Sequence, residues 1–199
     1  MDKILTSDRI RLEILPPLPE YAEQLSKLVN KNRDHLDMWR GDVLKYETPD
    51  TSFYKLLMDN YYYERNEGYF YHIMKGKNII GHISLLSSGK FWEVAYWLDK
   101  DYIGQGYMRE ALSTLEKAWF QKCTDPITVL IKPQNSASLN VVHKMGYVSF
   151  GQNRYLKNFA MFMGNQQKIT EPECIVKAQN LTVKKCCENS NESKSKERC

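Results

Sequence analysis

The stretch that most constrains the fold runs from Phe91 to Leu112 and reads FWEVAYWLDKDYIGQGYMREAL. Its first part, up to Leu98, consists mainly of aromatic, β-branched and apolar residues, which favour a largely buried strand. After Gly104-Gln105-Gly106, the apolar residues of the segment 107–115 recur at helical spacing. The pattern therefore predicts a strand, a tight turn and a helix that begins at the turn.

The two glycines at the start of this helix create a place where an anion can bind. They let the backbone turn tightly, and the free N–H groups and the positive dipole end of the first helical turn face the same spot. Such helix starts bind phosphate or pyrophosphate. The motif is not a P-loop, because no Gly-Lys-Ser/Thr follows, and Arg109 replaces the third glycine of the dinucleotide motif. A plain turn without a ligand is the alternative.

The residues before this stretch predict one strand and three helices. Arg9–Leu15 alternates charged and apolar residues, as a half-buried strand does. Helices are expected at residues 16–32, 32–39 and 51–66. The residues of the third helix that are expected to face the core are Phe53, Leu56, Leu57 and Tyr61. Asp50 or Thr51 would cap this helix.

The remaining elements complete an α+β fold. Short turns separate the strands expected at 69–75, 79–86 and 91–98, which indicates an antiparallel meander. The helix after the glycines directs Met108, Leu112, Leu115 and Trp119 inward. Next come a strand at 127–131, a helix that starts near Pro133 and ends at Gly146, and strands at 147–151 and 158–163. The sheet is mixed and mostly antiparallel, with one β-α-β crossover that places ligands at the carboxyl ends of its strands.

Composition predicts one domain followed by a tail. The 199 residues are 42% hydrophobic and 12% aromatic, which excludes a wholly disordered chain. We expect a folded domain over residues 1–164 and a flexible tail over 165–199, which is polar and holds lysines and four of the five cysteines. Binding of the tail to a partner or an acidic surface is the alternative.

The net charge and the cysteine content limit the cell compartments and the kinds of partner that are expected. The net charge of +4 is mild and predicts no nucleic-acid partner. No apolar run approaches the roughly 20 residues that cross a bilayer, and the N-terminus lacks the pattern of a signal peptide. The odd number of cysteines, without a regular framework, indicates reduced thiols. We therefore expect a cytoplasmic protein without a membrane partner, as a monomer or a homodimer.

Six pieces of the sequence together match one protein family. They are Arg9-Ile-Arg-Leu, Asn32-Arg-Asp-His-Leu-Asp-Met-Trp39, Ile80-Gly-His-Ile-Ser84, Glu93-Val-Ala-Tyr-Trp97, Gly104-Gln-Gly-Tyr-Met-Arg-Glu-Ala-Leu112, and Asn135-Ser-Ala-Ser-Leu-Asn-Val141 with Lys144-Met-Gly-Tyr147. The chain resembles the GNAT superfamily of acetyl-coenzyme A-dependent N-acetyltransferases, in its RimJ/RimL branch of ribosomal-protein N-terminal acetyltransferases. The resemblance implies the GNAT fold, with helices flanking a sheet whose central strands splay apart. It also implies acetyl-CoA as co-substrate, direct transfer in a ternary complex and no metal.

The resemblance assigns the coenzyme to the splayed strands and the glycine turn. The pantetheine arm would enter between the strand ending at Leu98 and the strand after the long helix. The residues implied for the pyrophosphate are Ile103, Gly104, Gln105, Gly106, Tyr107 and Met108. The backbone N–H groups implied for the acetyl carbonyl are those around Tyr96, Trp97 and Leu98.

Glu93 is the expected general base, acting directly or through water. It is the one charged residue of an otherwise apolar strand, at a position where the resembled branch usually carries glutamate. The alternative is that Glu93 points to solvent or pairs with Arg11 or Arg109.

Asn135 and Ser138 match the family's N-x-x-S and complete the expected catalytic set. The resemblance implies that Asn135 reaches the pantetheine or acetyl region and that Ser138 is the leaving-group acid; both also suit helix capping. Val142 stands where many GNAT enzymes have a general-acid tyrosine, so that acid is missing.

The acceptor is expected to be a protein N-terminal amine. A polyamine or aminoglycoside is the rival acceptor, with carboxylates available at Glu47, Asp50, Asp59, Glu64 and Glu67. A coenzyme-binding or partner-binding module without turnover is the third hypothesis. Trp39 and Tyr46 either contact a peptide acceptor or pack in the core, and His82 either lines the acceptor cleft or is a hydrogen-bonded structural histidine.

Overall fold

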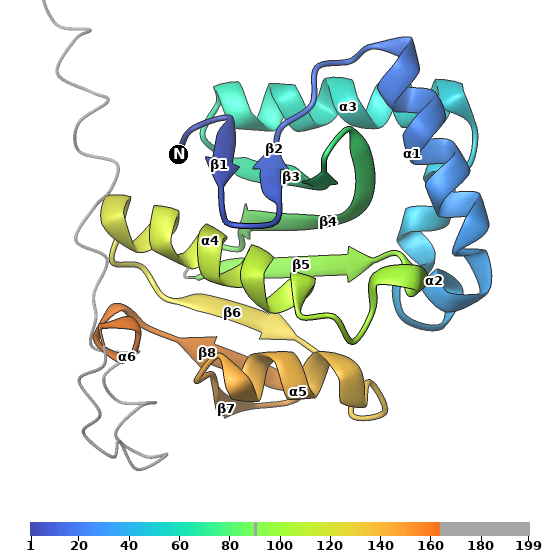
Figure 1. Cartoon of the computed structure of the whole chain (residues 1–199). Helices are drawn as coiled ribbons and strands as arrows, with labels where there is room; N and C mark the ends of the chain where they lie inside the picture. Colours follow the sequence, from blue (N-terminus) through green and yellow to red (C-terminus); the bar gives the residue numbers. More distant parts are fainter. Residues whose placement is uncertain (90, 164–199) are drawn as a thin grey trace, which may run out of the picture. The chain divides into compact units, whose positions relative to one another are not determined.

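The computed structural model describes residues 1–89 and 91–163, which are built around one eight-stranded sheet (Figure 1). The strands are β1 (Ile4–Thr6), β2 (Arg11–Glu13), β3 (Gly68–Lys75), β4 (Asn78–Ser87), β5 (Trp92–Leu98), β6 (Ile127–Leu130), β7 (Val148–Gly151) and β8 (Arg154–Lys157). They lie in the order β1-β2-β3-β4-β5-β6-β8-β7, with β5 and β6 parallel and the other recorded neighbours antiparallel. The predicted meander and the predicted crossover are confirmed. The expected tail at 165–199 lies outside the described residues.

Helices cover both faces of the sheet. One face carries α1 (Pro19–Lys31), α2 (Arg33–Arg40), the 3₁₀ turn η1 (Gly41–Tyr46) and α3 (Pro49–Glu64); the other carries α4 (Tyr107–Lys122) and α5 (Ser136–Lys144). The short η2 (Lys100–Tyr102) precedes α4, and α6 (Phe159–Phe162) follows β8. Within the described ranges, no helix combines the length and the apolar character that a bilayer crossing requires.

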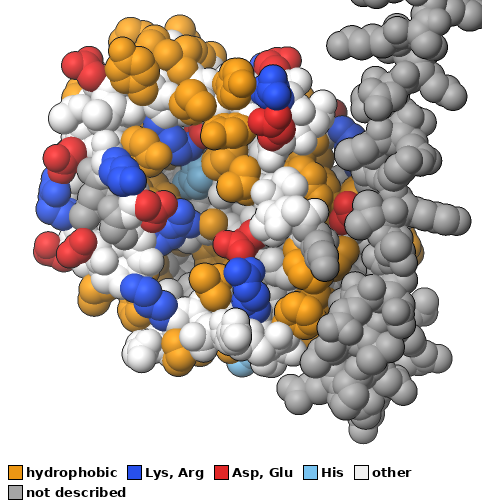
Figure 2. All heavy atoms as spheres, turned by 180° about the vertical axis from the view of Figure 1, so that it is seen from behind, with side chains coloured by type: hydrophobic (Ala, Val, Ile, Leu, Met, Phe, Trp, Pro, Cys, Tyr) orange, Lys and Arg blue, Asp and Glu red, His pale blue; other side chains and the backbone are white. Residues whose placement is uncertain are grey.

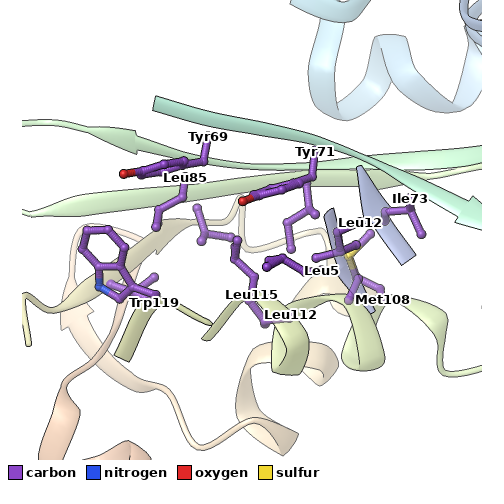
Figure 3. Close-up of a cluster of buried hydrophobic side chains, with 14 of the residues drawn as sticks. Leu5, Leu12, Tyr69, Tyr71, Ile73, Leu85, Met108, Leu112, Leu115 and Trp119 are labelled. Carbon is purple, nitrogen blue, oxygen red and sulfur yellow. The ribbon is translucent and has the colours of Figure 1, made fainter. Parts of the chain in front are cut away.

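The larger core lies between α4 and the sheet (Figure 3). All four side chains expected to point inward from this helix, Met108, Leu112, Leu115 and Trp119, are buried. They meet side chains of β1 to β4, among them Leu12, Tyr71 and Leu85. This packing fixes the start of α4, and with it the glycine turn, against the sheet.

The prediction for the buried face of α3 is only half right: Leu56 is buried and Phe53 packs against the same core, but the other two predicted residues are not buried. Leu57 and Tyr61 are 40% and 51% exposed, whereas Asp59 is buried. With Tyr54 and Met58 they form an exposed apolar stripe, and Figure 2 shows hydrophobic side chains gathered at the upper edge, where α3 runs. The apolar residues of α3 itself lie on several of its faces, so helical spacing alone does not indicate which face is buried.

The last predicted strand is also wrong. Residues 158–163 hold α6 instead of a strand, and β8 lies earlier, at Arg154–Lys157. Gln152 and Asn153 both have positive φ (46° and 62°), the backbone of a tight hairpin turn that starts β8 at once. Asn158 then ends the strand, because its side chain accepts a hydrogen bond from the N–H of Met161 at 2.9 Å and caps the short helix.

Two smaller differences concern where elements begin. Strand β1 was not predicted; it pairs with β2 at the edge of the sheet. Helix α3 is capped by Thr48, not by Asp50 or Thr51. Thr48 and Thr51 form a capping box in which each side chain bonds the other residue's backbone N–H, both at 3.2 Å.

Candidate active site

The centre of the sheet is open. Strands β5 and β6 pair only from Trp92 to Val94 and from Ile127 to Val129, although β5 continues beside β4 as far as Leu98. Beyond Val94 and Val129 the two parallel strands are therefore no longer joined, which confirms the predicted splay. We call the space between Ala95–Leu98 and the end of β6 the β5–β6 gap.

Two backbone donors of β5 point into the β5–β6 gap. The N–H of Trp92 donates toward β6, to the carbonyl of Pro126 at 3.2 Å, whereas the N–H of Asp99 donates toward β4, to Ile80 at 2.8 Å. Backbone groups alternate between the two sides of a strand. The N–H groups of Tyr96 and Leu98 consequently face the gap, where a carbonyl oxygen can accept their hydrogen bonds.

A cavity of about 580 Å³ opens at the β5–β6 gap. Its walls are β5, the segment from Tyr102 to Arg109, the segment from β6 to α5, and α2 with the start of η1. The predicted site residues that line it are Glu93, Tyr96, Trp97, Leu98, Ile103, Gly104, Gly106, Tyr107, Met108, Asn135 and Ser138. Gln105 is not among the lining residues, because its side chain turns back to donate to the carbonyl of Asp101 at 2.7 Å.

The glycine turn has the geometry that an anion site needs. Gly104 and Gly106 have φ of +80° and +85°, values that favour glycine. The first helical hydrogen bond of α4 joins the N–H of Glu110 to the carbonyl of Gly106 at 3.1 Å. The preceding N–H groups of the first turn therefore lie outside the helical ladder, at the positive end of a 16-residue helix.

Arg9 connects the N-terminal segment to the glycine turn and to the start of α4. Its guanidinium stacks on the ring of Tyr107 at 4.5 Å, donates to the carbonyl of Gln105 at 3.1 Å and pairs with Glu110 at 2.7 Å. Partial burial opposes ionisation of Glu110, but hydrogen bonds from Arg9 and Ser7 prevail and lower the pKa of this carboxyl. The negative charge in the first turn of α4 is thus balanced by Arg9.

The loop between β5 and the glycine turn is held by the end of α1. The ammonium of Lys31 lies 2.7 Å from the carboxylate of the buried Asp99 and 2.5 Å from that of Asp101. Asn32 accepts a hydrogen bond from the N–H of Lys100 at 2.9 Å. The Lys31 ammonium lowers the pKa of Asp101 and thereby favours the ion pair.

If the turn binds the pyrophosphate of acetyl-CoA, the co-substrate that the resemblance implies, Gly106→Ala is expected to raise the Kd for acetyl-CoA about tenfold. A side chain at this φ costs about 1–2 kcal/mol, and its Cβ would lie 3.4 Å from Nη2 of Arg9 and 3.6 Å from Nη2 of Arg109. Gly76→Ala is the matched control, because Gly76 has φ of +62° and open space around it, away from the cavity. In calorimetric titrations with acetyl-CoA, Gly106→Ala alone should have a higher Kd than the parent. Equal Kd values for the parent and Gly106→Ala would exclude the turn as the anion site.

Glu93 lies at the edge of the cavity, in an ion pair that was not predicted. Its Oε2 accepts from Nη1 of Arg154 on β8 at 2.8 Å, and its side chain is 33% exposed. The alternatives of pairing with Arg11 or Arg109 do not occur: Arg11 bonds Glu13 at 2.9 Å. Glu93 thus lines the same cavity as Tyr96 and Leu98, whose N–H groups face the β5–β6 gap.

Asn135 and Ser138 lie at the start of α5, where Ser138 contacts Tyr96. Asn135 caps this helix, since its Oδ1 accepts from the N–H of Ser138 at 3.0 Å. The hydroxyl of Tyr96 donates to the carbonyl of Ser138 at 3.4 Å, and burial raises the pKa of Tyr96 to about 12. Val142, at the position of the missing tyrosine, is fully buried.

Residues of α2 and the start of η1 form another wall of the cavity. Trp39 lines the cavity, whereas Tyr46 packs against a second, smaller core between the helices α1 to α3 and the sheet. Lys132, just after β6, donates to the carbonyl of Met38 at 3.2 Å and so connects this wall to the end of the β5–β6 gap. Arg40 pairs with Asp42 at 2.7 Å on the same wall.

Among the residues that were not predicted are two basic residues of the cavity lining and the arginine that pairs with Glu93. Arg154 was placed outside a strand because the final strand was expected at 158–163; the turn at Gln152-Asn153 is the signal that could have corrected this. Arg40 and Lys132 lie in segments without a motif. His82 is buried and is not among the lining residues of the cavity.

The family model for the acetyltransferase (GNAT) domain matches residues 11–148, more than half of the chain. The chain therefore belongs to the GNAT acetyltransferase family and is an enzyme of that class. No curated protein matches the chain in a sequence comparison.

Three solved structures illustrate the shared fold. A RimL ribosomal L7/L12 α-N-protein acetyltransferase in complex with coenzyme A has a TM-score of 0.71 at 18% identity, covering 78% of this chain and 97% of that one. The ribosomal-protein-S5-alanine acetyltransferase of Vibrio fischeri has a TM-score of 0.67 at 21% identity, covering 79% and 95%. The microcin C7 self-immunity acetyltransferase MccE, in complex with acetyl-CoA and AMP, has a TM-score of 0.66 at 18% identity, covering 76% and 93%.

Proposed function

We propose that this acetyltransferase moves the acetyl group of acetyl-CoA directly to the N-terminal amine of a protein. The observation that carries the proposal is the β5–β6 gap, where the N–H groups of Tyr96 and Leu98 face a cavity that also contains Glu93. The similar folds of two ribosomal-protein acetyltransferases, one of them in complex with coenzyme A, support this acceptor and this coenzyme.

The geometry supports a division of roles. The pyrophosphate of acetyl-CoA would lie on the glycine turn, and the N–H groups of Tyr96 and Leu98 would donate to the acetyl oxygen and stabilise its charge in the tetrahedral intermediate. Glu93 would take a proton from the attacking amine, directly or through water. The C–N bond forms first and gives the tetrahedral intermediate; its collapse breaks the C–S bond, and the coenzyme leaves as a thiolate.

The leaving thiolate needs a hydrogen-bond donor more than a strong acid. With a pKa of about 12, the phenol of Tyr96 is far less acidic than an ordinary thiol at about 8.5. A serine hydroxyl is a weaker acid still, so neither Tyr96 nor Ser138 would transfer its proton completely. We therefore assign to Ser138 a hydrogen bond to the leaving sulfur, with final protonation from solvent, and to Asn135 the positioning of Ser138 through the helix cap.

The charge of the cavity disfavours the polyamine and aminoglycoside acceptors. Its lining includes four cationic residues, Arg40, Arg109, Lys132 and Lys144, and two acidic ones, Asp42 and Glu93. None of the five carboxylates considered for a polycation, Glu47, Asp50, Asp59, Glu64 and Glu67, is among the lining residues. A polycation would therefore meet net repulsion.

A panel of acceptors tests the proposal. Thiol release from acetyl-CoA, with mass detection of the product, would be measured against N-terminal peptides, polyamines and aminoglycosides. Turnover with peptides alone is expected. Turnover with a small amine alone would show that the acceptor is a small amine and not a protein N-terminus. Tight acetyl-CoA binding without turnover on any acceptor would favour a coenzyme-binding module that does not catalyse transfer.

A further inference from the structure

A buried polar cluster lies between α3 and the sheet, outside the cavity of the proposed function. It consists of Asp59 on α3, His72 on β3 and His82 on β4, which are 2%, 0% and 8% exposed. The two histidines are direct cross-strand partners, with ring centroids 5.3 Å apart. One possible ligand atom of each of the three residues lies within 4.8 Å of the other two.

Several atoms of this cluster have no hydrogen-bond partner among the described residues. They are Oδ2 of Asp59, both ring nitrogens of His72 and Nε2 of His82. Buried polar atoms are normally hydrogen-bonded, so a group of unpaired atoms in one place requires an explanation. A buried water or a bound cation would supply the missing partner.

The three side chains offer the kind of atoms that a metal ion needs. A neutral imidazole keeps a lone pair on one ring nitrogen, and a carboxylate oxygen is also an acceptor. Each residue can therefore present one lone pair to a cation at the point where their ligand atoms converge.

We propose that Asp59, His72 and His82 bind a divalent transition-metal ion of the zinc type. Two imidazoles and one carboxylate are ligands that Zn²⁺ prefers, and a water would complete the tetrahedron. The ion would join α3 to β3 and β4. His82 pairs in register with Trp97, whose side chain lines the cavity, so the ion would support the sheet behind the site without taking part in acetyl transfer.

Lys55 supplies a test of this assignment. Its ammonium bonds Oδ1 of Asp59 and leaves Oδ2 as the oxygen available to a metal. An ammonium beside the site repels a second cation. Lys55→Met is therefore expected to tighten metal binding about tenfold, the opposite of what the loss of a ligand would do.

The experiment uses the full chain with Cys174, Cys186, Cys187 and Cys199 replaced by serine, because thiolates also bind zinc. Co²⁺ is titrated as a spectroscopic probe, and bound Zn²⁺ is measured by elemental analysis. We expect one equivalent of metal, visible bands of tetrahedral cobalt without a thiolate charge-transfer band, and a higher Tm in the presence of Zn²⁺.

Variants decide whether these residues are the ligands. His72→Gln, His82→Gln and Asp59→Asn are each expected to abolish binding, whereas the exposed His143→Gln keeps it. Absence of stoichiometric metal in the folded parent, or binding that survives loss of either histidine, would overturn the proposal in favour of a buried water. If a ligand variant does not fold, the comparison of Lys55→Met with the parent decides, and unchanged affinity counts against the site.

Discussion

Replacement of Glu93 by glutamine is expected to lower kcat by about 10²- to 10⁴-fold, the range that general acid–base catalysis contributes. The amide keeps the shape of the side chain and can still accept a hydrogen bond from Arg154, which lies 2.8 Å away, but it cannot take up the proton of the amine. Because the glycine turn is unchanged, the Kd for acetyl-CoA is expected to stay the same. Steady-state kinetics with the accepted acceptor and calorimetric titration with acetyl-CoA measure the two quantities.

Glu13→Gln is the matched control for this variant. Glu13 is also a half-buried strand carboxylate that pairs with an arginine, Arg11 at 2.9 Å, but it is not among the lining residues of the cavity. Its kcat should equal that of the parent. Full turnover in Glu93→Gln would remove Glu93 from the chemistry and leave membership of the family untouched.

Lys157→Met is expected to lower the free energy of unfolding by about 3–5 kcal/mol, the cost of leaving a buried charge unpaired. Nζ of Lys157 lies 2.7 Å from the carboxylate of Glu116 and 2.6 Å from the carbonyl of Met145, and the side chains of Lys157 and Glu116 are 8% and 1% exposed. This pair fastens β8 to α4. Urea denaturation of parent and variant at pH 7.5 gives the difference directly.

The decrease in the free energy of unfolding caused by Lys157→Met should become smaller as the pH falls. Burial already raises the pKa of Glu116, although Lys157 opposes this shift, so removal of the lysine raises the pKa further. A carboxyl whose pKa is higher in the folded than in the unfolded state takes up a proton on folding, which favours the folded state at low pH and disfavours it as the pH rises. The difference between parent and variant should therefore be smaller at pH 5 than at pH 7.5.

A double variant separates the buried charge from loss of packing. Glu116→Met with Lys157→Met removes both charges and is expected to recover most of the stability that Lys157→Met loses, because an apolar pair of similar volume replaces the ion pair. A double variant as unstable as Lys157→Met would show that the shape of these side chains, and not the unpaired carboxylate, causes the loss.

Local patterns determined the central unit of the fold. The strand ending at Leu98, the turn at Gly104-Gln105-Gly106 and the inward side chains of α4 all occur as predicted. Each depends on residues close in sequence: apolar composition, freedom of the glycine backbone and helical spacing. The motifs of the resemblance then named residues that the structure brings together in one cavity, with Gln105 as the exception.

Contacts between distant residues were decided by the tertiary structure. Arg9 meets Glu110 across 101 positions of sequence, and Glu93 meets Arg154 across 61. Neither pair leaves a local signal, because the charges come together only after the sheet has placed their strands and helices side by side. The ion pair of Glu93, the expected base, was therefore missed.

The inner face of α3 shows the same limit most clearly. Its apolar side chains occur on several sides, so helical spacing allowed Leu57 and Tyr61 to point inward, whereas the folded chain buries Asp59 beside His72 and His82. Neighbouring residues are enough to specify that a helix, a meander and a glycine turn form. Which face of the helix is buried, and which polar groups are buried with it, depended on how α3 packs against α1, η1 and β3, which helical spacing does not reveal.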